Sequence, residues 1–291
     1  MGRTTRTALL IMGPSLLGVA VFYYYPILQS LIYSLFRLEF TTDWIGAPFV
    51  GLGNYLSVVT DSAFLSALAF TLIFTAVVVL VDLTVGMVLA VASFWVHPKL
   101  RGVFRAFIII PWAIPNVIQA SLWRWLLNAE AGVIGDLLVR MGLVAKPPLF
   151  LANEWLAGIS LVLVYSWKGA AIASLFLMAG LATIPSELKE SALMDGAGRL
   201  RRFFSITVPV MWPTIFVALL YRTRDALRVF DVVFGLTQGG PGNATETLST
   251  LAYRTYFGFN RYGLGSSYAI ITFLLVLAVS MIYLRRIVRA F

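Results

Sequence analysis

Long runs of apolar residues, separated by short polar segments, dominate the chain. A helix needs roughly 20 mostly apolar residues to cross a bilayer. Six runs reach that length: residues 8–36, 64–96, 103–127, 156–184, 206–227 and 264–284. The pattern predicts an all-α, polytopic membrane protein with six transmembrane helices. The first run is longer than the core of a signal peptide and no small-residue cleavage site follows it, so we expect it to remain as a span.

Prolines interrupt several of these runs. Each proline removes a backbone donor and bends the helix that contains it. Such breaks are tolerated where the freed carbonyl groups face protein or a water-filled cavity. The prolines concerned are Pro14, Pro26, Pro111, Pro115, Pro209 and Pro213. The bundle is therefore expected to contain bent helices around a polar interior.

Basic residues lie mainly between the apolar runs and mainly on one side of the membrane. Loops rich in Lys and Arg stay in the cytoplasm. With the amino terminus inside, the cytoplasmic flanks carry twelve basic residues and the outer flanks carry five. This asymmetry predicts that both termini are cytoplasmic in a multi-pass protein of the inner, or cytoplasmic, membrane. The long outer connections are then residues 37–63, 128–155 and 229–263.

Composition narrows the possible chemistry. Of the 291 residues, 60% are hydrophobic and 12% are charged, about half the charged share of a soluble domain, so most of the exterior is expected to face lipid. The chain has no Cys and a single His, His97, which leaves no predicted disulfide, metal site or catalytic constellation. The net charge of +9 comes from residues that flank spans rather than from a patch, so nucleic acid is not an expected partner.

A polar segment, about 185–209, separates the fourth and fifth runs. Pro185 stops the span, Ser186 is a good N-cap, and Glu187 and Glu190 favour the positive end of a new short helix. Gly196 ends this helix and allows a sharp turn.

A second short helix, basic and aromatic, is expected at about 199–205 and leads into the fifth span. The first helix has a modest apolar face made by Leu188, Ala192 and Leu193. Two short helices at an angle would form a knob at the inner membrane surface. Such a knob suits docking into a cleft on a cytoplasmic partner.

Residue identities in this segment resemble a known motif. Glu190-Ser191-Ala192, Asp195-Gly196-Ala197 and the downstream Pro209 match the EAA loop of binding-protein-dependent ABC importer permeases. Ser191 and Val208 depart from the usual Ala and Leu, and both changes are small. In that family the loop is a coupling helix that inserts into the ATPase subunit. The resemblance implies this coupling role for Glu190, Ala192, Asp195, Gly196 and Ala197.

The resemblance covers nearly the whole chain. Residues 51–55, Trp167-Lys168, Phe230-Asp231 and 236–247 look like the sugar-type permeases related to the first maltose permease subunit. The six spans and short amino terminus are similar to the compact sugar and glycerol-phosphate members. Physically, Gly239, Gly240 and Pro241 break the last outer loop into a rigid bend, which we expect to contact a docked binding protein.

The resemblance also implies an assembly. It predicts the type I ABC importer fold, with residues 1–291 as one transmembrane permease domain. The partners would be a second homologous permease, two copies of a cytoplasmic ABC ATPase and an external sugar-binding protein, all in or at membrane lipid. No nucleotide-binding loop G-x-x-x-x-G-K-[ST] occurs in the chain. No cofactor is therefore expected in this chain, since ATP and Mg would be bound by the ATPase.

Charged residues cluster in and just after the fifth run. Near the bilayer centre, each charge that faces lipid costs about 2.5–3.5 kcal/mol even on the mildest scale. At 100° per residue, Arg224, Arg228 and Asp231 fall within about 60° of one another, with Asp225 beside Arg228 and Arg222 on the opposite side. This stripe is predicted to face the bundle interior or the outer mouth of a pathway. Its role is left open between a structural ion-pair network, substrate contact and pairing with a partner permease.

Polar residues in other spans extend the candidate pathway. Asp82 and Lys168 favour a structural pair, or pairing with a partner subunit, over a proton relay. Asn116 and Gln119 follow the prolines of the third run, and amide groups suit sugar hydroxyls. Trp123 and Trp125 could stack on sugar rings but are also typical interfacial anchors. The candidate substrate-pathway residues are Asn116, Gln119, Arg224, Asp225 and Arg228.

Several functions remain open at this point. The leading one is import of a di- or oligosaccharide, with glycerol-3-phosphate or a polyol as the alternative, because the arginines of the fifth run suit a phosphate. An ion-driven secondary transporter would be expected to show inverted repeats around broken helices, which the sequence does not display. An intramembrane enzyme or assembly factor would need a catalytic constellation that the chain lacks.

Overall fold

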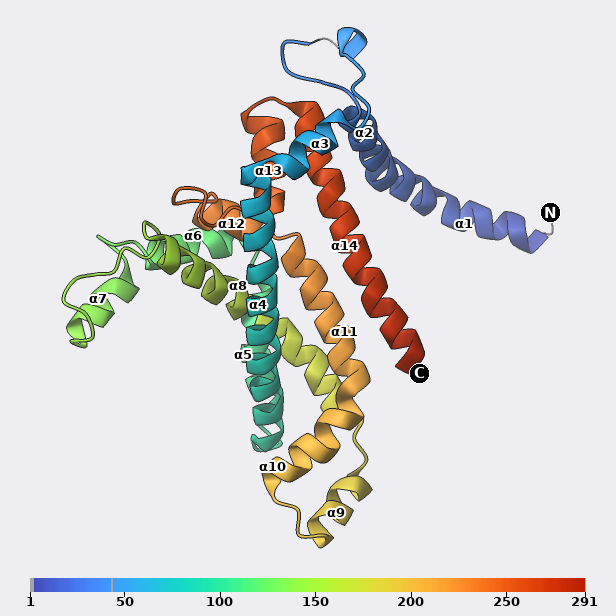
Figure 1. Cartoon of the computed structure of the whole chain (residues 1–291). Coiled ribbons are helices and arrows are strands. Elements are labelled where there is room, and N and C mark those ends of the chain that lie inside the picture. Colours follow the sequence, from blue (N-terminus) through green and yellow to red (C-terminus); the bar gives the residue numbers. More distant parts are fainter. Residues whose placement is uncertain (1–2, 43, 291) are drawn as a thin grey trace. The chain divides into compact units, whose positions relative to one another are not determined.

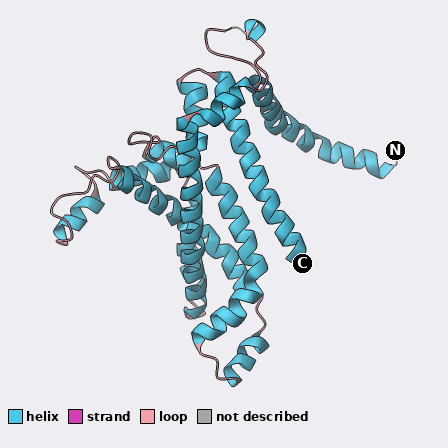
Figure 2. Cartoon of the chain, viewed as in Figure 1, coloured by secondary structure: helices cyan, strands magenta, loops and turns pink. Residues whose placement is uncertain are grey.

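The computed structural model describes residues 3–42 and 44–290. Within those ranges the regular structure is helical, and β pairing is limited to an isolated antiparallel bridge between Phe36 and Phe49 (Figure 2). The all-α prediction is therefore confirmed for the described part of the chain.

Five described helices are long and apolar enough to cross a membrane: Ile11–Ser34, Ser62–Trp95, Glu154–Ala182, Arg199–Leu227 and Tyr262–Arg285. A sixth span is made by two shorter helices, α5 (Arg101–Ala113) and α6 (Asn116–Leu126), which are bent by 92° at the break between them. The six predicted runs thus all correspond to helices, and the third is the one that departs from a continuous span.

The bend between α5 and α6 follows from local sequence. Ile114 precedes Pro115, and the proline ring pushes the residue before it out of the helical region. Ile114 accordingly has extended backbone angles, with φ −76° and ψ 127°. Pro115 then serves as the N-cap of α6, a place where its missing N–H costs nothing. A proline predicted to bend one helix instead divides it into two.

The Cα packing of the chain divides it into two compact units, Met1–Leu65 with Leu251–Leu274, and Ser66–Thr250 with Leu275–Phe291. The boundaries fall inside α4 (Ser62–Trp95), α13 (Leu248–Tyr253) and α14 (Tyr262–Ala290). The two units are described separately below. One permease domain over residues 1–291 stays a prediction.

The first unit begins with one long helical path. It consists of α1 (Arg3–Val19), a π turn at Ala20–Tyr24 and α2 (Tyr25–Ser34). A short 3₁₀ turn (Trp44–Gly46) and α3 (Gly53–Thr60) follow, and α13 leads through a second π turn, Arg254–Gly258, to the start of α14. Several apolar side chains of the first path, such as Phe22 and Tyr23, are strongly exposed, as expected for a helix that faces lipid.

Hydrogen bonds from α3 hold the end of α2. The side-chain amide of Asn54 donates to the carbonyl oxygens of Ser34 and Phe36, both at 2.9 Å, and the hydroxyls of Ser34 and Tyr55 lie 2.5 Å apart. Tyr268 on α14 donates to the carboxylate of Asp61 at 2.6 Å. Asn54 and Tyr55 belong to the stretch 51–55 that resembles sugar-type permeases, and here they have a structural role.

The second unit contains α4 from Ser66 onward, α5, α6, α7 (Val133–Arg140), α8 (Glu154–Ala182) and α9 (Ser186–Met194). It continues with α10 (Arg199–Arg202), a π turn at Phe203–Thr207, α11 (Val208–Leu227) and α12 (Asp231–Leu236). In Figure 1, α8 crosses behind α4 toward the lower part of α11, and α9 and α10 lie at the lower end of α11. Helix α8 packs against α5 and α11 and is the most buried span.

Small residues let the helices of this unit approach closely. A Cβ atom added at Gly86 of α4 would lie 2.9 Å from the Cβ of Ala173 on α8. One added at Gly180 of α8 would lie 2.9 Å from the Cβ of Thr214 on α11. Glycine interfaces of this kind are common between membrane helices, because association there depends on close van der Waals packing. Two apolar clusters, one around Leu161 and Val233 and one around Leu177 and Met211, complete the core.

Candidate functional site

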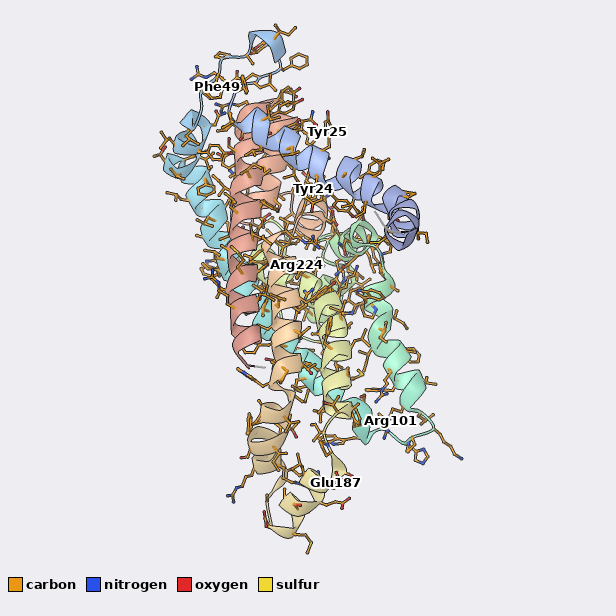
Figure 3. The ribbon with its side chains drawn as sticks, turned by 90° about the vertical axis from the view of Figure 1, so that its right-hand side faces the viewer. Tyr24, Tyr25, Phe49, Arg101, Glu187 and Arg224 are labelled. Atoms are coloured by element: carbon orange, nitrogen blue, oxygen red, sulfur yellow. The ribbon has the colours of Figure 1, made fainter. Side chains whose placement is uncertain are left out.

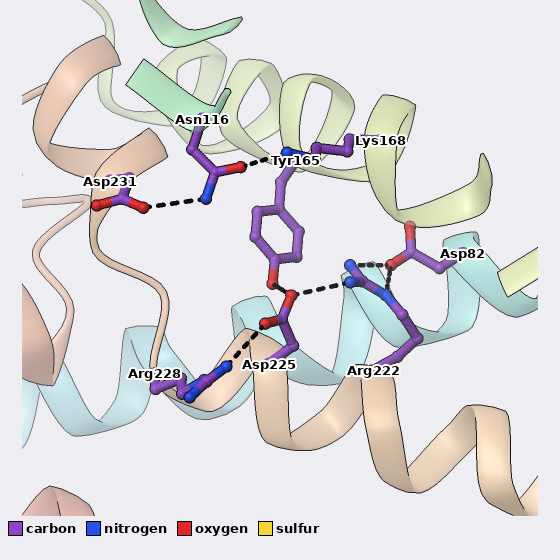
Figure 4. Close-up of polar contacts among 8 residues, drawn as sticks. All are labelled: Asp82, Asn116, Tyr165, Lys168, Arg222, Asp225, Arg228 and Asp231. Carbon is purple, nitrogen blue, oxygen red and sulfur yellow. Dashed lines mark hydrogen bonds and ion pairs between the residues drawn. The ribbon is translucent and has the colours of Figure 1, made fainter. Parts of the chain in front are cut away.

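A buried ion pair joins α4 to α11. Nη2 of Arg222 lies 2.6 Å from Oδ2 of Asp82, and Nε of Arg222 donates to the same oxygen at 2.7 Å. The two side chains are 4% and 0% exposed. Figure 4 shows how the pair continues to Asp225, whose Oδ2 accepts from Nη1 of Arg222 at 3.0 Å and from the hydroxyl of Tyr165 at 2.8 Å. Two carboxylates thus share one guanidinium between three helices.

The pair depends on a glycine of α8. A Cβ atom at Gly169 would collide with both Arg222 and Asp82. A residue with any side chain would therefore have to displace the ion pair or move the helix. The ring of Tyr165, one turn earlier on α8, lies 5.0 Å from the guanidinium carbon of Arg222, within the range of a cation–π contact. One face of α8 is thus shaped around Arg222.

A second group of hydrogen-bonded polar side chains lies at the break between α5 and α6. The ammonium group of Lys168 donates to the carbonyl oxygen of Ile114 at 2.8 Å and to Oδ1 of Asn116 at 2.7 Å. Asn116 in turn donates from its side-chain amide to Oδ2 of Asp231 at 3.0 Å (Figure 4). The broken helix frees a carbonyl group at Ile114, and Lys168 satisfies it. This is the arrangement that makes non-helical backbone tolerable at membrane depth.

The ion-pair network around Arg222 and the hydrogen-bonded group around Lys168 line a shared cavity of about 170 Å³. Its polar lining comes from Asn116, Gln119, Tyr165, Lys168, Arg222 and Asp225. Trp112 and Tyr221 add aromatic surface. Gln119 is fully buried and donates to the carbonyl oxygen of Val164 at 2.5 Å. Of the five candidate pathway residues, three (Asn116, Gln119 and Asp225) line this cavity.

The charged stripe does not face the interior of this chain's own bundle, and its other predicted position, the outer mouth of a pathway, stays a prediction. Arg224, Arg228 and Asp231 are exposed on this chain, whereas Arg222, placed on the opposite side in the prediction, is buried. The guanidinium of Arg224 lies 5.7 Å from the ring of Tyr221, and that of Arg228 lies 3.6 Å from Asp225. The helical projection was sound, but the interior side is set by Asp82 on another helix. For the described residues Arg222, Asp82 and Asp225, the geometry is a structural ion-pair network.

A second correction concerns Asp82 and Lys168, which do not pair with each other. Asp82 pairs with Arg222, and Lys168 binds Asn116 and the carbonyl oxygen of Ile114. Trp123 makes an edge contact with Trp167, with ring centroids 5.6 Å apart, while Trp125 is 55% exposed. Neither Trp123 nor Trp125 lines the cavity.

The predicted knob is present, and its turn is a Schellman motif. Gly196 has φ +68°, its N–H donates to the carbonyl of Leu193, and the N–H of Ala197 donates to the carbonyl of Ala192, both at 3.0 Å. This pair of hydrogen bonds, with glycine in the left-handed region, is a common way to end a helix. Ala192 is buried, while Glu190, Asp195 and Gly196 are exposed. Figure 3 labels Glu187 on the same short helix.

Two details of the knob differ from prediction. Ser186 is not the N-cap, because the helix starts at Ser186 and the capping position is taken by Pro185, with no side-chain cap. The helix predicted at 199–205 is not separate, since α10, the π turn and α11 run on as one helix from Arg199 to Leu227. Pro209 comes just after the π turn Phe203–Thr207 and does not end this helix.

The bend at Gly239, Gly240 and Pro241 is braced from within its own loop. The hydroxyl of Thr245 donates to the carbonyl oxygen of Gly240 at 2.6 Å and lies 2.8 Å from the hydroxyl of Thr237. Gly239 is buried and has φ +84°. The exposed part of the loop consists instead of Gln238, Gly242 and Asn243. Both threonines lie in the stretch 236–247 that resembles sugar-type permeases, but their bracing role was not predicted from the sequence.

Among the described residues, no group of three or more His, Cys, Asp or Glu side chains is placed to hold a metal ion.

Known proteins resemble the chain over almost its full length. The family model for "Binding-protein-dependent transport system inner membrane component" matches residues 82–290. The trehalose/maltose transport system permease protein MalF of Thermococcus litoralis is 38% identical over 286 residues, which cover 97% of this chain and 94% of that protein. The sn-glycerol-3-phosphate transport system permease protein UgpA of Agrobacterium fabrum is 33% identical over 273 residues, which cover 94% of this chain and 90% of that protein.

A solved structure has the same fold. It is the crystal structure of a bacterial alginate ABC transporter in complex with an alginate pentasaccharide-bound periplasmic protein. One of its chains matches with a TM-score of 0.82 and 24% identity, and the match covers 96% of this chain and 93% of that chain. The predicted fold of an ABC importer permease is therefore confirmed.

Proposed function

The chain belongs to the family of inner membrane components of binding-protein-dependent transport systems, and on that premise we propose that it is the permease subunit of an ABC importer for an uncharged di- or oligosaccharide. The observation that carries the proposal is the match to a trehalose/maltose permease over 97% of this chain. The membrane-spanning helices fit that role.

Charge balance in the cavity supports a neutral sugar over a phosphate. The guanidinium of Arg222 already faces two carboxylates, those of Asp82 and Asp225. The ammonium group of Lys168 is bonded to an amide and a carbonyl oxygen. A phosphate entering the cavity would have to displace these partners, whereas sugar hydroxyls can exchange hydrogen bonds with Asn116, Tyr165 and Asp225. Aromatic surface from Trp112 and Tyr221 suits the apolar face of a sugar ring.

The size of the cavity supports a partner permease. Small-molecule sites usually measure about 300–1,000 Å³, and this chain alone offers about 170 Å³. A disaccharide would need more space than that. We infer that the exposed side chains of Arg224 and Arg228, which contact the cavity-lining residues Tyr221 and Asp225, face a second, homologous permease that completes the pathway.

The remaining partners follow from the two loops. The knob presents exposed Glu190 and Asp195 beside the exposed apolar side chains of Leu193 and Met194, a mixed surface suited to docking in a cleft of an ATPase subunit. Glu190, Ala192, Asp195, Gly196 and Ala197 would transmit its motion. The loop containing Gly239, Gly240 and Pro241 would face an external binding protein, with both chain termini in the cytoplasm. ATP and Mg would be bound by two copies of the ATPase.

Glycerol-3-phosphate is the second candidate substrate, favoured by the 33% identity to a glycerol-3-phosphate permease. Uptake by the complete transporter in proteoliposomes distinguishes the two. We expect labelled maltose or trehalose to enter with the binding protein outside and ATP inside, and glycerol-3-phosphate to enter at background rate. Glycerol-3-phosphate uptake without disaccharide uptake would replace the substrate proposal. Uptake that needs a proton or Na⁺ gradient but no ATP would overturn the ABC assignment itself.

A further inference from the structure

A groove of about 880 Å³ lies where α4 ends and α10 begins. Its lining combines apolar side chains with arginines. The lining residues that matter here are Phe94, Trp95, Leu181, Leu200, Arg199 and Arg202. Trp95 is the last residue of α4 and is 76% exposed, as is Leu200. An exposed tryptophan at the end of a span is typical of the boundary between lipid tails and headgroups.

Positive charge gathers around this groove. Beside Arg199 and Arg202, the guanidiniums of Arg101 and Arg105 lie 5.7 and 5.1 Å from the ring centre of Phe94, which is part of the groove wall. Within the described residues, none of these four arginines makes an ion pair. Figure 3 labels Arg101, the first residue of α5.

Three hydrogen-bond donor atoms of the arginines in this region are buried and make no hydrogen bond within the described part of the chain. The Nε atoms of Arg101, Arg105 and Arg202 are inaccessible to solvent and have no hydrogen-bond partner among the described residues. Of these three arginines, Arg202 lines the groove itself, where an acceptor would satisfy its buried, unpartnered donor. A doubly accepting, negatively charged group such as a phosphate diester matches guanidinium donors best.

We propose that this groove binds an anionic phospholipid. The phosphate group sits against Arg199 and Arg202, and an acyl chain follows the apolar wall of Phe94, Trp95 and Leu181. Free phosphate would leave that wall in water, and a soluble acidic peptide would not reach along a span. The predicted orientation places the groove in the cytoplasmic leaflet. Because α10 carries both arginines and adjoins the knob, the lipid stabilises the base of the knob.

Binding is tested on the full chain by native mass spectrometry, with phosphatidylglycerol and phosphatidylcholine offered in equal amounts. We expect preferential retention of phosphatidylglycerol. A basic residue near an anionic membrane surface contributes about 1 kcal/mol, or about fivefold in affinity. The double variant Arg199→Gln/Arg202→Gln should therefore weaken phosphatidylglycerol binding about 25-fold, while phosphatidylcholine binding stays the same.

The matched control is Arg201→Gln, on the same turn of α10 but outside the groove lining, which should retain phosphatidylglycerol like the unaltered chain. Arg199→Lys/Arg202→Lys should keep most of the affinity, which excludes misfolding as the cause. Equal retention of the two lipids, or equal loss in Arg201→Gln and the double variant, would overturn the proposal. So would full displacement of the lipid by glycerol phosphate, which has the headgroup chemistry without the acyl chains. None of these readouts depends on which solute is transported.

Discussion

Arg222 and Asp82 lie 140 positions apart in the chain, yet their side chains form an ion pair of 2.6 Å that water does not reach. The pair fixes α11 against α4 beside the cavity. Removing charges from water is costly, so a buried pair adds less to stability than its short distance suggests. Removing one partner is a different matter, because it leaves the other charge buried and uncompensated. The pair is therefore a sensitive point for both stability and helix arrangement.

The first prediction is that Asp82→Asn destabilises the folded chain. Loss of one partner of a buried pair typically costs about 3–5 kcal/mol. We expect the lower end, about 3 kcal/mol, because Asp225 still faces Arg222. The free energy of unfolding of the purified protein in mixed micelles measures the effect. Asp136→Asn, which breaks the exposed pair with Arg140, is the control and should change stability by less than about 1 kcal/mol. Equal effects of the two variants would contradict the structure.

The second prediction concerns Gly169. Its Cβ atom would collide with Arg222 and Asp82, so Gly169→Ala should destabilise the protein by about 1–3 kcal/mol, the usual cost of overpacking. Gly158 lies in the same helix with open space around it. There an alanine should be neutral or stabilising by up to about 1 kcal/mol. Thermal unfolding of both variants makes the comparison, and a Gly169→Ala variant as stable as Gly158→Ala would show that the pair does not need this glycine.

The third prediction concerns coupling at Gly196. Its φ of +68° is unfavourable for any L side chain, although the space around it is open. Gly196→Trp should therefore distort the knob by backbone strain and by bulk at the docking surface. ATP-dependent sugar uptake should fall at least tenfold, with normal membrane insertion and normal sugar binding by the binding protein. Gly198→Ala is the control, since Gly198 has ordinary φ and open surroundings.

The fourth prediction is a charge reversal on the same knob. Glu190→Lys alters an exposed side chain and should leave the fold unchanged while weakening attachment of the ATPase. Co-purification of the ATPase and the rate of sugar uptake should both drop. Unchanged values in this variant and in Gly196→Trp, at normal expression, would mean that this loop does not couple transport to ATP hydrolysis.

The fifth prediction is the orientation of the chain. Because the chain has no Cys, single cysteines at Ser186 and Asn243, both exposed, report their side unambiguously. An impermeant thiol reagent applied to intact cells should label Asn243→Cys and not Ser186→Cys. Permeabilised cells should show labelling of both positions. Labelling of both in intact cells would refute the six-span topology.

Much of the fold was predictable, because its signals are local. An apolar run of sufficient length indicates a span whatever it packs against. The residue before Pro115 explains the break after α5, and Gly196 explains the end of α9, since both depend on backbone angles that a single residue type dictates. These features need no knowledge of the rest of the molecule.

The site was harder to predict, because its contacts join distant parts of the chain. A helical projection of α11 groups Arg224 with Arg228 but cannot say which side of the helix meets a neighbour. That side is decided by Asp82, which lies in another helix. The contact of Lys168 with the carbonyl oxygen of Ile114 was likewise invisible, because the acceptor is backbone freed by a break whose angle the sequence does not specify. Tertiary partners, not residue types, decided which charges are buried.

The unbroken helix from Arg199 to Leu227 has a mechanical consequence. Its 29 residues span about 43 Å at 1.5 Å per residue, and Arg222 lies about 35 Å from its start. A rod of that length acts as a lever arm: tilting it by about 5° around Arg222 moves its first turn by about 3 Å. The π turn at Phe203–Thr207 and Pro213 are its compliant sections. If the knob couples to an ATPase as proposed, a push on it would reach the buried pair as torque along this helix.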